Sequence, residues 1–152
     1  MKKIVVTGGA GFIGSNLVKY LLKKKYFVIN IDKLSYSANP YNIKDLKKNK
    51  NYVFVKADIN NKNKIIKILR KYKPNGIFNL AAETHVDRSI ENAKDFINSN
   101  ILGTYNLLEA ILAFNKKIKL VHVSTDEVYG DVIKGRSDEK HSYNPSSPYS
   151  AS

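Results

Sequence analysis

Cysteine is absent from the 152 residues of this sequence, which excludes several kinds of chemistry at once. Without a thiol there is no disulfide, no thiolate nucleophile, no iron–sulfur cluster and no zinc site with cysteine ligands. The absence also fits a reducing compartment, so a cytoplasmic location is the default expectation. The length suits one domain, and such a chain buries roughly 68–70% of the surface that its unfolded form exposes, enough for a core without covalent staples.

Long apolar segments are lacking as well. No stretch approaches the roughly 18 apolar residues that suggest a membrane-spanning helix. The first six residues imitate a signal peptide, but Thr7-Gly8-Gly9 ends the apolar run too early for one. We therefore expect residues 3–7 to form a buried first strand, and we expect no membrane partner.

Acidic residues are few: 13 Asp and Glu stand against 26 Lys and Arg, which gives a formal net charge of +13. Such a balance invites a nucleic-acid interpretation. However, arginine is scarce and the lysines are scattered, whereas nucleic-acid binders more often concentrate arginine and aromatic residues on one surface. The charge therefore favours a solvated, lysine-rich surface without a nucleic-acid partner, and it is compatible with an anionic small ligand.

Short runs rich in β-branched residues alternate with segments of helical period. Ile13, Leu17 and Leu21 recur every four residues, and the apolar residues within 65–69 share one side of a lysine-rich segment. This alternation predicts an α/β fold with a doubly wound parallel sheet and helices on both faces. Most expected strands are apolar throughout, as strands covered on both faces should be. They are residues 3–7, 27–31, 52–56, 76–80 and 119–124.

The longest helical pattern runs from residue 93 to residue 114, with Gly103 inside it. Glycine costs a helix interior about 1 kcal/mol, so we expect close packing of the backbone at Gly103. After Tyr129 the apolar periodicity stops, and the polar segment that follows is predicted to be a loop. Tyr149 stands after this loop, at the expected start of another helix.

The sharpest motif is Thr7-Gly8-Gly9-Ala10-Gly11-Phe12-Ile13-Gly14, between the first expected strand and the first expected helix. Glycines at this spacing permit a tight turn, close approach of a pyrophosphate to the helix N-terminus, and close packing of helix on strand. Asp32 follows about 20 residues later, where a carboxylate can bond the adenosine ribose. Asp32 would repel a 2′-phosphate, so the pattern favours NAD over NADP, although Lys33 beside it weakens that preference.

Small and polar residues follow the third and fourth expected strands. Asp58-Ile59 could reach the edge of an adenine, or Asp58 could be a helix N-cap. Ala81-Ala82 leave room for a cofactor to pass over the backbone, and Glu83 and Thr84 would line the crevice beyond. Because ligands bind at the carboxyl ends of strands in open α/β sheets, this run is either a cleft or a packing feature.

Thr125-Asp126-Glu127 follows the fifth expected strand. Two adjacent carboxyl groups in a partly buried cleft cannot both ionise freely, so one would serve as acid and the other as base, as an elimination requires. The three histidines are far apart in the sequence: we expect His122 to be a satisfied core residue, and His85 and His141 lack a ligand partner at metal spacing. No metal is predicted.

Several of these segments together resemble the extended short-chain dehydrogenase/reductase family, which contains NAD-dependent sugar-nucleotide epimerases and dehydratases. Thr125-Asp126-Glu127 resembles the 4,6-dehydratases most, because the epimerases usually lack this adjacent acid pair. The segments that carry the resemblance are residues 7–14, 32–35, 58–59, 80–89, 100–104, 124–130 and 147–152.

The resemblance implies a Rossmann-type fold, NAD as the cofactor and a nucleoside-diphosphate hexose as the substrate. dTDP-glucose is the favoured substrate, although UDP and GDP sugars remain alternatives. The product would serve deoxysugar (rhamnose) biosynthesis. Thr84 and Thr125 would meet the sugar. The implied NAD contacts are Gly8, Gly11, Phe12, Ile13, Gly14, Asp32, Lys33, Leu34, Ser35, Asp58, Ile59, Leu80, Ala81, Ala82, Glu83, Thr84, Ser99 and Tyr149.

The same resemblance implies four catalytic residues. Tyr149 would take the proton of the C4 hydroxyl while hydride passes to NAD, and Thr125 would bond that oxygen. Glu127 would remove the C5 proton. Asp126 would protonate the departing C6 hydroxyl, and hydride would return to C6, so NAD is regenerated in each turnover.

The family motif Tyr-x-x-x-Lys needs a Lys four residues after Tyr149, and the sequence stops at Ser152. We therefore expect residues 1–152 to be an incomplete NAD-binding domain that is inactive alone, with the sugar-nucleotide-binding domain absent and the complete protein a homodimer. Two alternatives stay open: another sugar-nucleotide modifier, such as an epimerase or decarboxylase, and a non-catalytic NAD-binding module.

Overall fold

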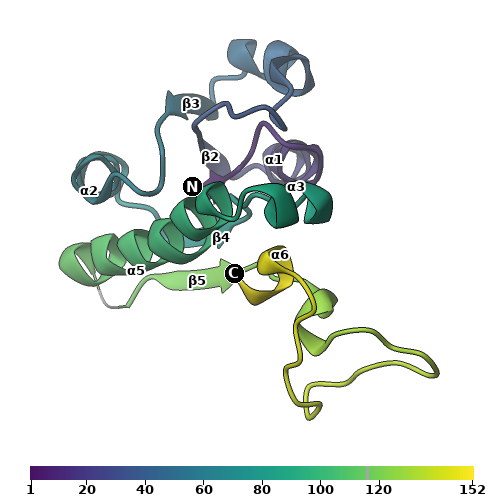
Figure 1. The fold of residues 1–152 in the computed structure, drawn as a ribbon. Helices are drawn as coiled ribbons and strands as arrows, with labels where there is room; N and C mark the ends of the chain where they lie inside the picture. Colours follow the sequence, from purple (N-terminus) through teal and green to yellow (C-terminus); the bar gives the residue numbers. More distant parts are fainter. Residues whose placement is uncertain (116) are drawn as a thin grey trace.

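A computed structural model describes residues 1–115 and 117–152 and shows one five-stranded parallel sheet (Figure 1). All five expected strands are present, with ends that differ by at most two residues from the prediction. The fold class predicted from the sequence is therefore confirmed. The strands are β1 (Lys3–Thr7), β2 (Phe27–Asp32), β3 (Tyr52–Lys56), β4 (Gly76–Asn79) and β5 (Lys119–His122).

The sheet order is β3-β2-β1-β4-β5, so the chain winds outward from β1 in both directions. Thr7 of β1 is in register with Ile31 of β2 on one side and with Asn79 of β4 on the other. Because the winding reverses at β1, the connections after β1 and β4 leave in opposite directions and open a crevice at the carboxyl edge. This is where open α/β sheets bind ligands.

Alternation along the strands supplies two cores. Val5 faces α2 (Lys62–Tyr72) and α5 (Gly103–Phe114), whereas Val6 faces α1 (Phe12–Lys23). Successive residues of a strand point to opposite faces, so apolar strands can bury both sides under helices. A 3-10 helix, η1 (Pro40–Lys48), adds Leu46 to the α1 side.

The edge strand β5 departs from the expected burial. Val121 is 49% exposed and His122 is exposed, and only Leu120 of this strand is partly buried. The prediction that His122 is a core residue is wrong, because β5 pairs with β4 on one side only in the described chain. A sequence pattern does not distinguish an edge strand from a central one.

The helix expected at residues 93–114 is interrupted. It comprises α4 (Lys94–Phe96), the π-helix η2 (Ile97–Leu102) and α5. A Cβ at Gly103 would lie 2.9 Å from side-chain carbons of Ile59, so the close packing predicted at this glycine is confirmed. The π-helical turn was not predicted, and such turns are frequent at functional sites.

The last part of the chain extends away from the sheet as a loop (Figure 1). It runs from the 3-10 helix η3 (Asp126–Tyr129) to α6 (Pro148–Ala151), where Ser147 forms a capping box with Ser150. The predicted loop and the helix start near Tyr149 are therefore confirmed, whereas α3 (Val86–Glu91) was not predicted. In the part of the chain that the structure describes, no helix has the length and apolar character needed to cross a membrane.

Candidate functional site

A cavity of about 410 Å³ opens at the carboxyl edge of the sheet. Its walls come from the glycine-rich turn and from the segments that follow β2, β3, β4 and β5, together with α6 and the π-helix η2. These segments are far apart in the sequence and meet only because parallel strands all point their carboxyl ends to one edge. The crevice expected from the topology is therefore present as a cavity.

Two glycines of the glycine-rich turn are required for steric reasons, and a third lines the cavity. Gly8 has φ +67°, and a Cβ there would lie 2.7 Å from the carbonyl carbon of Leu80. A Cβ at Gly14 would overlap the carbonyl oxygen of Gly8. At Gly11, which lines the cavity, a Cβ would meet only Gly8 O within 4 Å, at 3.3 Å. Gly11 is also the N-cap of α1 and provides no side-chain cap, which leaves N–H groups there for an anion.

Asp32 fastens the glycine-rich turn to the end of β2. Its Oδ2 accepts the N–H of Ala10 at 2.9 Å, its Oδ1 accepts the N–H of Leu34 at 2.7 Å, and the residue is 7% exposed. Each carboxylate oxygen retains a further lone pair, so a ribose hydroxyl can still bind. Asp32 thus shapes the site in addition to facing it.

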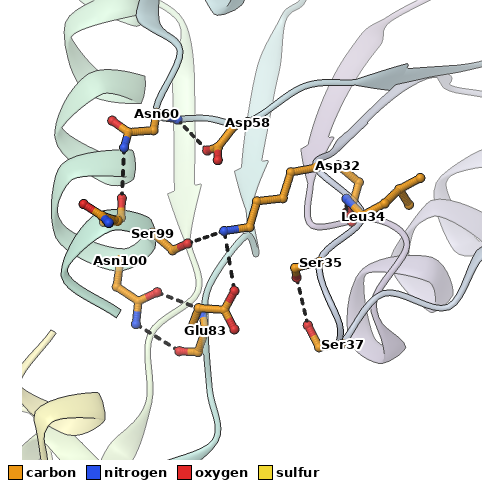
Figure 2. A network of polar contacts seen from close by, with 11 residues as sticks. Asp32, Leu34, Ser35, Ser37, Asp58, Asn60, Glu83, Ser99 and Asn100 are labelled. Atoms are coloured by element: carbon orange, nitrogen blue, oxygen red, sulfur yellow. Dashed lines mark hydrogen bonds and ion pairs between the residues drawn. The ribbon is translucent and has the colours of Figure 1, made fainter. Parts of the chain in front are cut away.

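Lys33 extends to the opposite wall. Its Nζ donates to Ser99 Oγ at 2.6 Å and lies 3.5 Å from Glu83 Oε1. In Figure 2, Glu83 and Ser99 lie together, and Asp32 stands across from them. The π-helix brings Ser99 to this place, so the unpredicted turn has a direct effect on the site.

The side chain of Asn100 holds the segment after β4 by two hydrogen bonds to the backbone of one residue. Its Oδ1 accepts the N–H of Glu83 at 2.8 Å, and its Nδ2 donates to the carbonyl oxygen of Glu83 at 2.9 Å (Figure 2). The same Nδ2 lies 2.8 Å from Ser152 Oγ. Asn100 therefore links this wall of the cavity to the end of α6.

A polar chain lies beneath the cavity and joins three strands. Thr7 Oγ1 donates to Asn79 Oδ1 and accepts the N–H groups of Leu80 and Ala81, each at 3.2 Å. Asn79 Nδ2 lies 2.9 Å from His122 Nδ1. Asn79 is buried, so these bonds satisfy groups that would otherwise be unpaired.

Asp58 lines the cavity and is not the cap of α2. The N-cap is Asn61, whose side chain accepts the N–H of Lys64 at 3.0 Å, whereas Asp58 Oδ1 accepts the N–H of Asn60 at 2.9 Å. Of the two alternatives left open for Asp58, the helix cap is wrong. The cavity position is the one that the structure shows.

The residues predicted to be catalytic divide into two pairs. Thr125 and Tyr149 line the cavity, and Tyr149 makes an edge contact with Phe96 at 6.2 Å between ring centroids. Asp126 and Glu127 lie in η3, are exposed and do not line the cavity. The expectation that the acid pair lies in a partly buried cleft is wrong for the described chain, because η3 projects beyond the edge strand β5.

Most of the predicted site residues meet at this cavity. Leu34 and Glu83 lie outside its lining, as do Asp126 and Glu127. The predicted residues that line it are Gly8, Gly11, Phe12, Ile13, Gly14, Asp32, Lys33, Ser35, Asp58, Ile59, Leu80, Ala81, Ala82, Thr84, Ser99, Thr125 and Tyr149.

Sequence reasoning missed other lining residues. Asn100 and Thr104 stand in the segment 100–104, which carried the resemblance without suggesting a role for either, so that segment was the available signal. The remaining missed residues are Ile31, Ser37, Ala38, Ala57, His122, Val123, Ser124, Val128, Ser150 and Ser152. Ser124, Val128, Ser150 and Ser152 stand in segments that carried the resemblance, whereas the others are small or apolar residues or, in the case of His122, a strand residue that no motif marks.

The lining fits a dinucleotide in two independent respects. Gly11 lines the cavity at the N-terminus of α1 and carries no side chain, so a pyrophosphate can approach the backbone there. Thr104 Oγ1 is buried, lies in a lining residue and has no hydrogen-bond partner among the described residues. Such an atom favours a polar ligand group. Across residues 1–115 and 117–152, no cluster of three His, Asp or Glu residues is placed to hold a metal ion.

Sheet order, glycine-rich turn and cavity together define a Rossmann-type α/β domain. The family model described as GDP-mannose 4,6 dehydratase matches residues 5–152. The chain belongs to this family.

Individual relatives agree with the family assignment. The dTDP-glucose 4,6-dehydratase of Haemophilus influenzae is 47% identical over 100% of this chain and 48% of that protein. A Streptomyces venezuelae dTDP-glucose 4,6-dehydratase, solved with NAD bound, has a TM-score of 0.92 and 39% identity, over 98% of this chain and 47% of that one. The Thermus thermophilus UDP-glucose 4-epimerase in complex with NAD has a TM-score of 0.87 and 34% identity, over 98% and 46%. The chain thus spans about half the length of these proteins.

Proposed function

We propose that this chain is the NAD-binding part of a nucleotide-sugar 4,6-dehydratase, a hydro-lyase that converts dTDP-glucose into dTDP-4-keto-6-deoxyglucose and water. One observation carries the proposal: Thr125 and Tyr149 line the cavity, and the adjacent acids Asp126 and Glu127 directly follow Thr125 in the chain. The similarity to dTDP-glucose 4,6-dehydratases over the whole chain supports it.

The cofactor proposed for the cavity is NAD, which when bound accepts a hydride from the substrate and returns it later in the turnover. The chain's residues position it. Gly11 leaves the helix N-terminus open to the pyrophosphate, and Asp32 presents a negative charge where an adenosine ribose hydroxyl can donate. Thr84 and Ser99 contribute hydroxyl groups to the lining.

The proposed proton transfers are carried out by residues of the segment after β5 and of α6. Tyr149 accepts the proton of the C4 hydroxyl as C4 is oxidised to a ketone, and Thr125 donates a hydrogen bond to that oxygen. The ketone acidifies C5–H, and Glu127 removes that proton. Asp126 donates a proton to the departing C6 hydroxyl, which leaves as water.

The balance of this sequence closes within one turnover. C4 loses a proton and a hydride, C5 loses a proton, and C6 loses its hydroxyl group. C6 then gains the hydride, C5 regains a proton through Glu127, and the proton held by Tyr149 is released to solvent, from which Asp126 is reprotonated, so the net change is the loss of one water. Asp126 and Glu127 are exposed at η3, so both are accessible to a sugar that extends from the cavity mouth.

A second candidate function is a 4-epimerase, because epimerases are also among the similar solved structures. The adjacent acid pair Asp126-Glu127 favours the dehydratase, since epimerisation at C4 needs no base at C5 and no acid at C6. A decarboxylase, which needs a carboxyl group that dTDP-glucose lacks, or a non-catalytic NAD-binding module would each give no product in the test.

We further propose that the nucleotide of the substrate is bound by a sugar-nucleotide-binding domain outside these residues and that the complete protein is a homodimer. The length of the relatives, about twice that of this chain, supports the first point. Neither the cytoplasmic location nor the homodimer is tested by the structure or by the comparisons, so both remain predictions.

The test has two parts. Calorimetric titration of this chain with NAD is expected to show binding. The protein that carries this domain is then incubated with dTDP-glucose, and the account expects a 4-keto-6-deoxy sugar. A C4 epimer, or no product with well-bound NAD, would each contradict the dehydratase assignment.

A further inference from the structure

Glu83 is a buried carboxylate whose cationic partner is Lys33. The Glu83 side chain is 6% exposed, and its Oε1 lies 3.5 Å from Lys33 Nζ. The backbone N–H and carbonyl of Glu83 both bond Asn100, so the residue is held in place from a second direction. Burying a charge is costly unless a partner of opposite charge is near. Glu83 therefore fixes where the Lys33 ammonium lies.

Lys33 follows Asp32 directly, yet the two charges face different walls of the cavity. The Asp32 carboxylate bonds the backbone of Ala10 and Leu34, whereas Lys33 Nζ lies between Ser99 and Glu83. Figure 2 shows this separation, with Asp32 and Leu34 on one side and Glu83 and Ser99 on the other. Because β1 lies between β2 and β4, the Lys33–Glu83 ion pair joins the segments that follow two strands that are not neighbours.

This separation bears on the choice between two dinucleotides. NADP differs from NAD by a 2′-phosphate on the adenosine ribose, the position that Asp32 is proposed to face. A free lysine beside Asp32 would offer that phosphate an ammonium partner and offset the repulsion from Asp32. In this structure the ammonium is occupied elsewhere, by Ser99 and Glu83.

We propose that Glu83 sets a preference for NAD over NADP by holding the Lys33 ammonium at Ser99, away from the ribose position beside Asp32. This inference rests on the proposed function, because it assumes that the cavity binds NAD. Glu83 is then a positioning residue that acts through Lys33, which agrees with its place outside the cavity lining.

The experiment measures dissociation constants of NAD and NADP by calorimetry for the parent chain and four variants. Both dinucleotides contain the pyrophosphate, so their affinity ratio isolates the 2′-phosphate. Glu83→Gln is expected to raise the affinity for NADP relative to NAD by roughly 3- to 10-fold, as expected for a newly available charged hydrogen bond. Lys33→Met is expected to keep the parent ratio within about twofold, and the double variant to match Lys33→Met.

Glu109→Gln is the matched control. It breaks the Lys62–Glu109 ion pair at 2.9 Å, in which the lysine is exposed to a similar degree, outside the cavity lining. The ratio should not change in this control. An unchanged ratio in Glu83→Gln would overturn the inference, as would a several-fold loss of NADP affinity in Lys33→Met alone. A parent chain that binds neither dinucleotide would contradict the proposed function instead, so the two failures are distinguishable.

Discussion

The side chain of Asn100 bonds the peptide groups of Glu83 in both directions, through Oδ1 at 2.8 Å and Nδ2 at 2.9 Å. This pairing ties the π-helix η2 to the segment after β4, which forms one wall of the cavity. Among residues 1–115 and 117–152, Glu83 has no backbone partner within a strand, because β4 ends at Asn79. Asn100 therefore replaces the sheet as the support of this wall.

Asn100→Ala is expected to lower the free energy of unfolding by about 1–3 kcal/mol, because the Glu83 peptide groups lose their partner. NAD affinity should fall together with stability, since the wall is no longer held. Urea unfolding and calorimetry measure the two effects. Asn16→Ala is the control: this exposed side chain bonds the carbonyl of Phe12, and its loss should change stability by less than about 0.5 kcal/mol. Equal effects of the two substitutions would contradict the role of Asn100.

Two glycines of the turn should respond differently to added side chains. Gly11 lines the cavity and a Cβ there meets only Gly8 O, at 3.3 Å, so Gly11→Val should collapse NAD affinity while the fold survives. Gly14→Ala forces a Cβ against the carbonyl oxygen of Gly8, so the fold itself should lose stability. Circular dichroism and calorimetry separate the outcomes. Undiminished NAD affinity in Gly11→Val would refute the pyrophosphate position.

Asp32→Ala should weaken both the fold and NAD binding. The N–H of the buried Ala10 loses its acceptor, and an unsatisfied buried donor costs about 1–3 kcal/mol of unfolding free energy. NAD affinity should fall by a similar amount if the ribose bond is lost. Thermal unfolding and calorimetry test the two effects, and a loss of stability with undiminished NAD affinity would leave Asp32 a structural role only.

Tyr52 should make the stability of the fold fall at high pH. Burial raises the pKa of Tyr52 above its ordinary value, and the charge of Asp32 adds to this, although the hydrogen bond from Asn30 opposes it. The folded state thus favours the neutral phenol. The resulting stability is complete below the unfolded pKa of about 10 and is lost as pH rises through the folded pKa, by at most about 1.4 kcal/mol per pH unit.

Comparison of unfolding free energies from pH 8 to 12 tests this point. Tyr52→Phe should remove that part of the decline, whereas Tyr41→Phe should leave it unchanged, because Tyr41 is 79% exposed. Parallel curves for the parent and Tyr52→Phe would show that the phenol does not titrate differently on folding.

The acid pair should divide the elimination. In the protein that carries this domain, Glu127→Gln should permit C4 oxidation but abolish exchange of the C5 hydrogen with solvent. Asp126→Asn should slow loss of water by roughly 10²–10⁴-fold, the usual effect of removing a general acid. Nuclear magnetic resonance follows both. C5 exchange at the parent rate in Glu127→Gln would exclude Glu127 as the base.

Features that depend on residues close together in the sequence could be predicted, and features that depend on distant residues could not. Strands and the glycine-rich turn are encoded locally, by β-branched runs and by the spacing of Gly8, Gly11 and Gly14, and they were predicted. Asn100 acts on Glu83, 17 positions away along the chain, and Lys33 contacts Ser99, 66 positions away, so no local pattern predicts either role. The exposure of His122 was missed for a similar reason, because it depends on which strands flank β5.

The central claim is that hydride leaves C4 of the sugar and returns to C6 of the same molecule. The most direct measurement incubates the protein that carries this domain with dTDP-glucose deuterated at C4 and locates the label in the product by nuclear magnetic resonance. The account predicts a 4-keto-6-deoxy sugar with the deuterium at C6. Deuterium retained at C4 in an epimer, or lost to solvent, would contradict it.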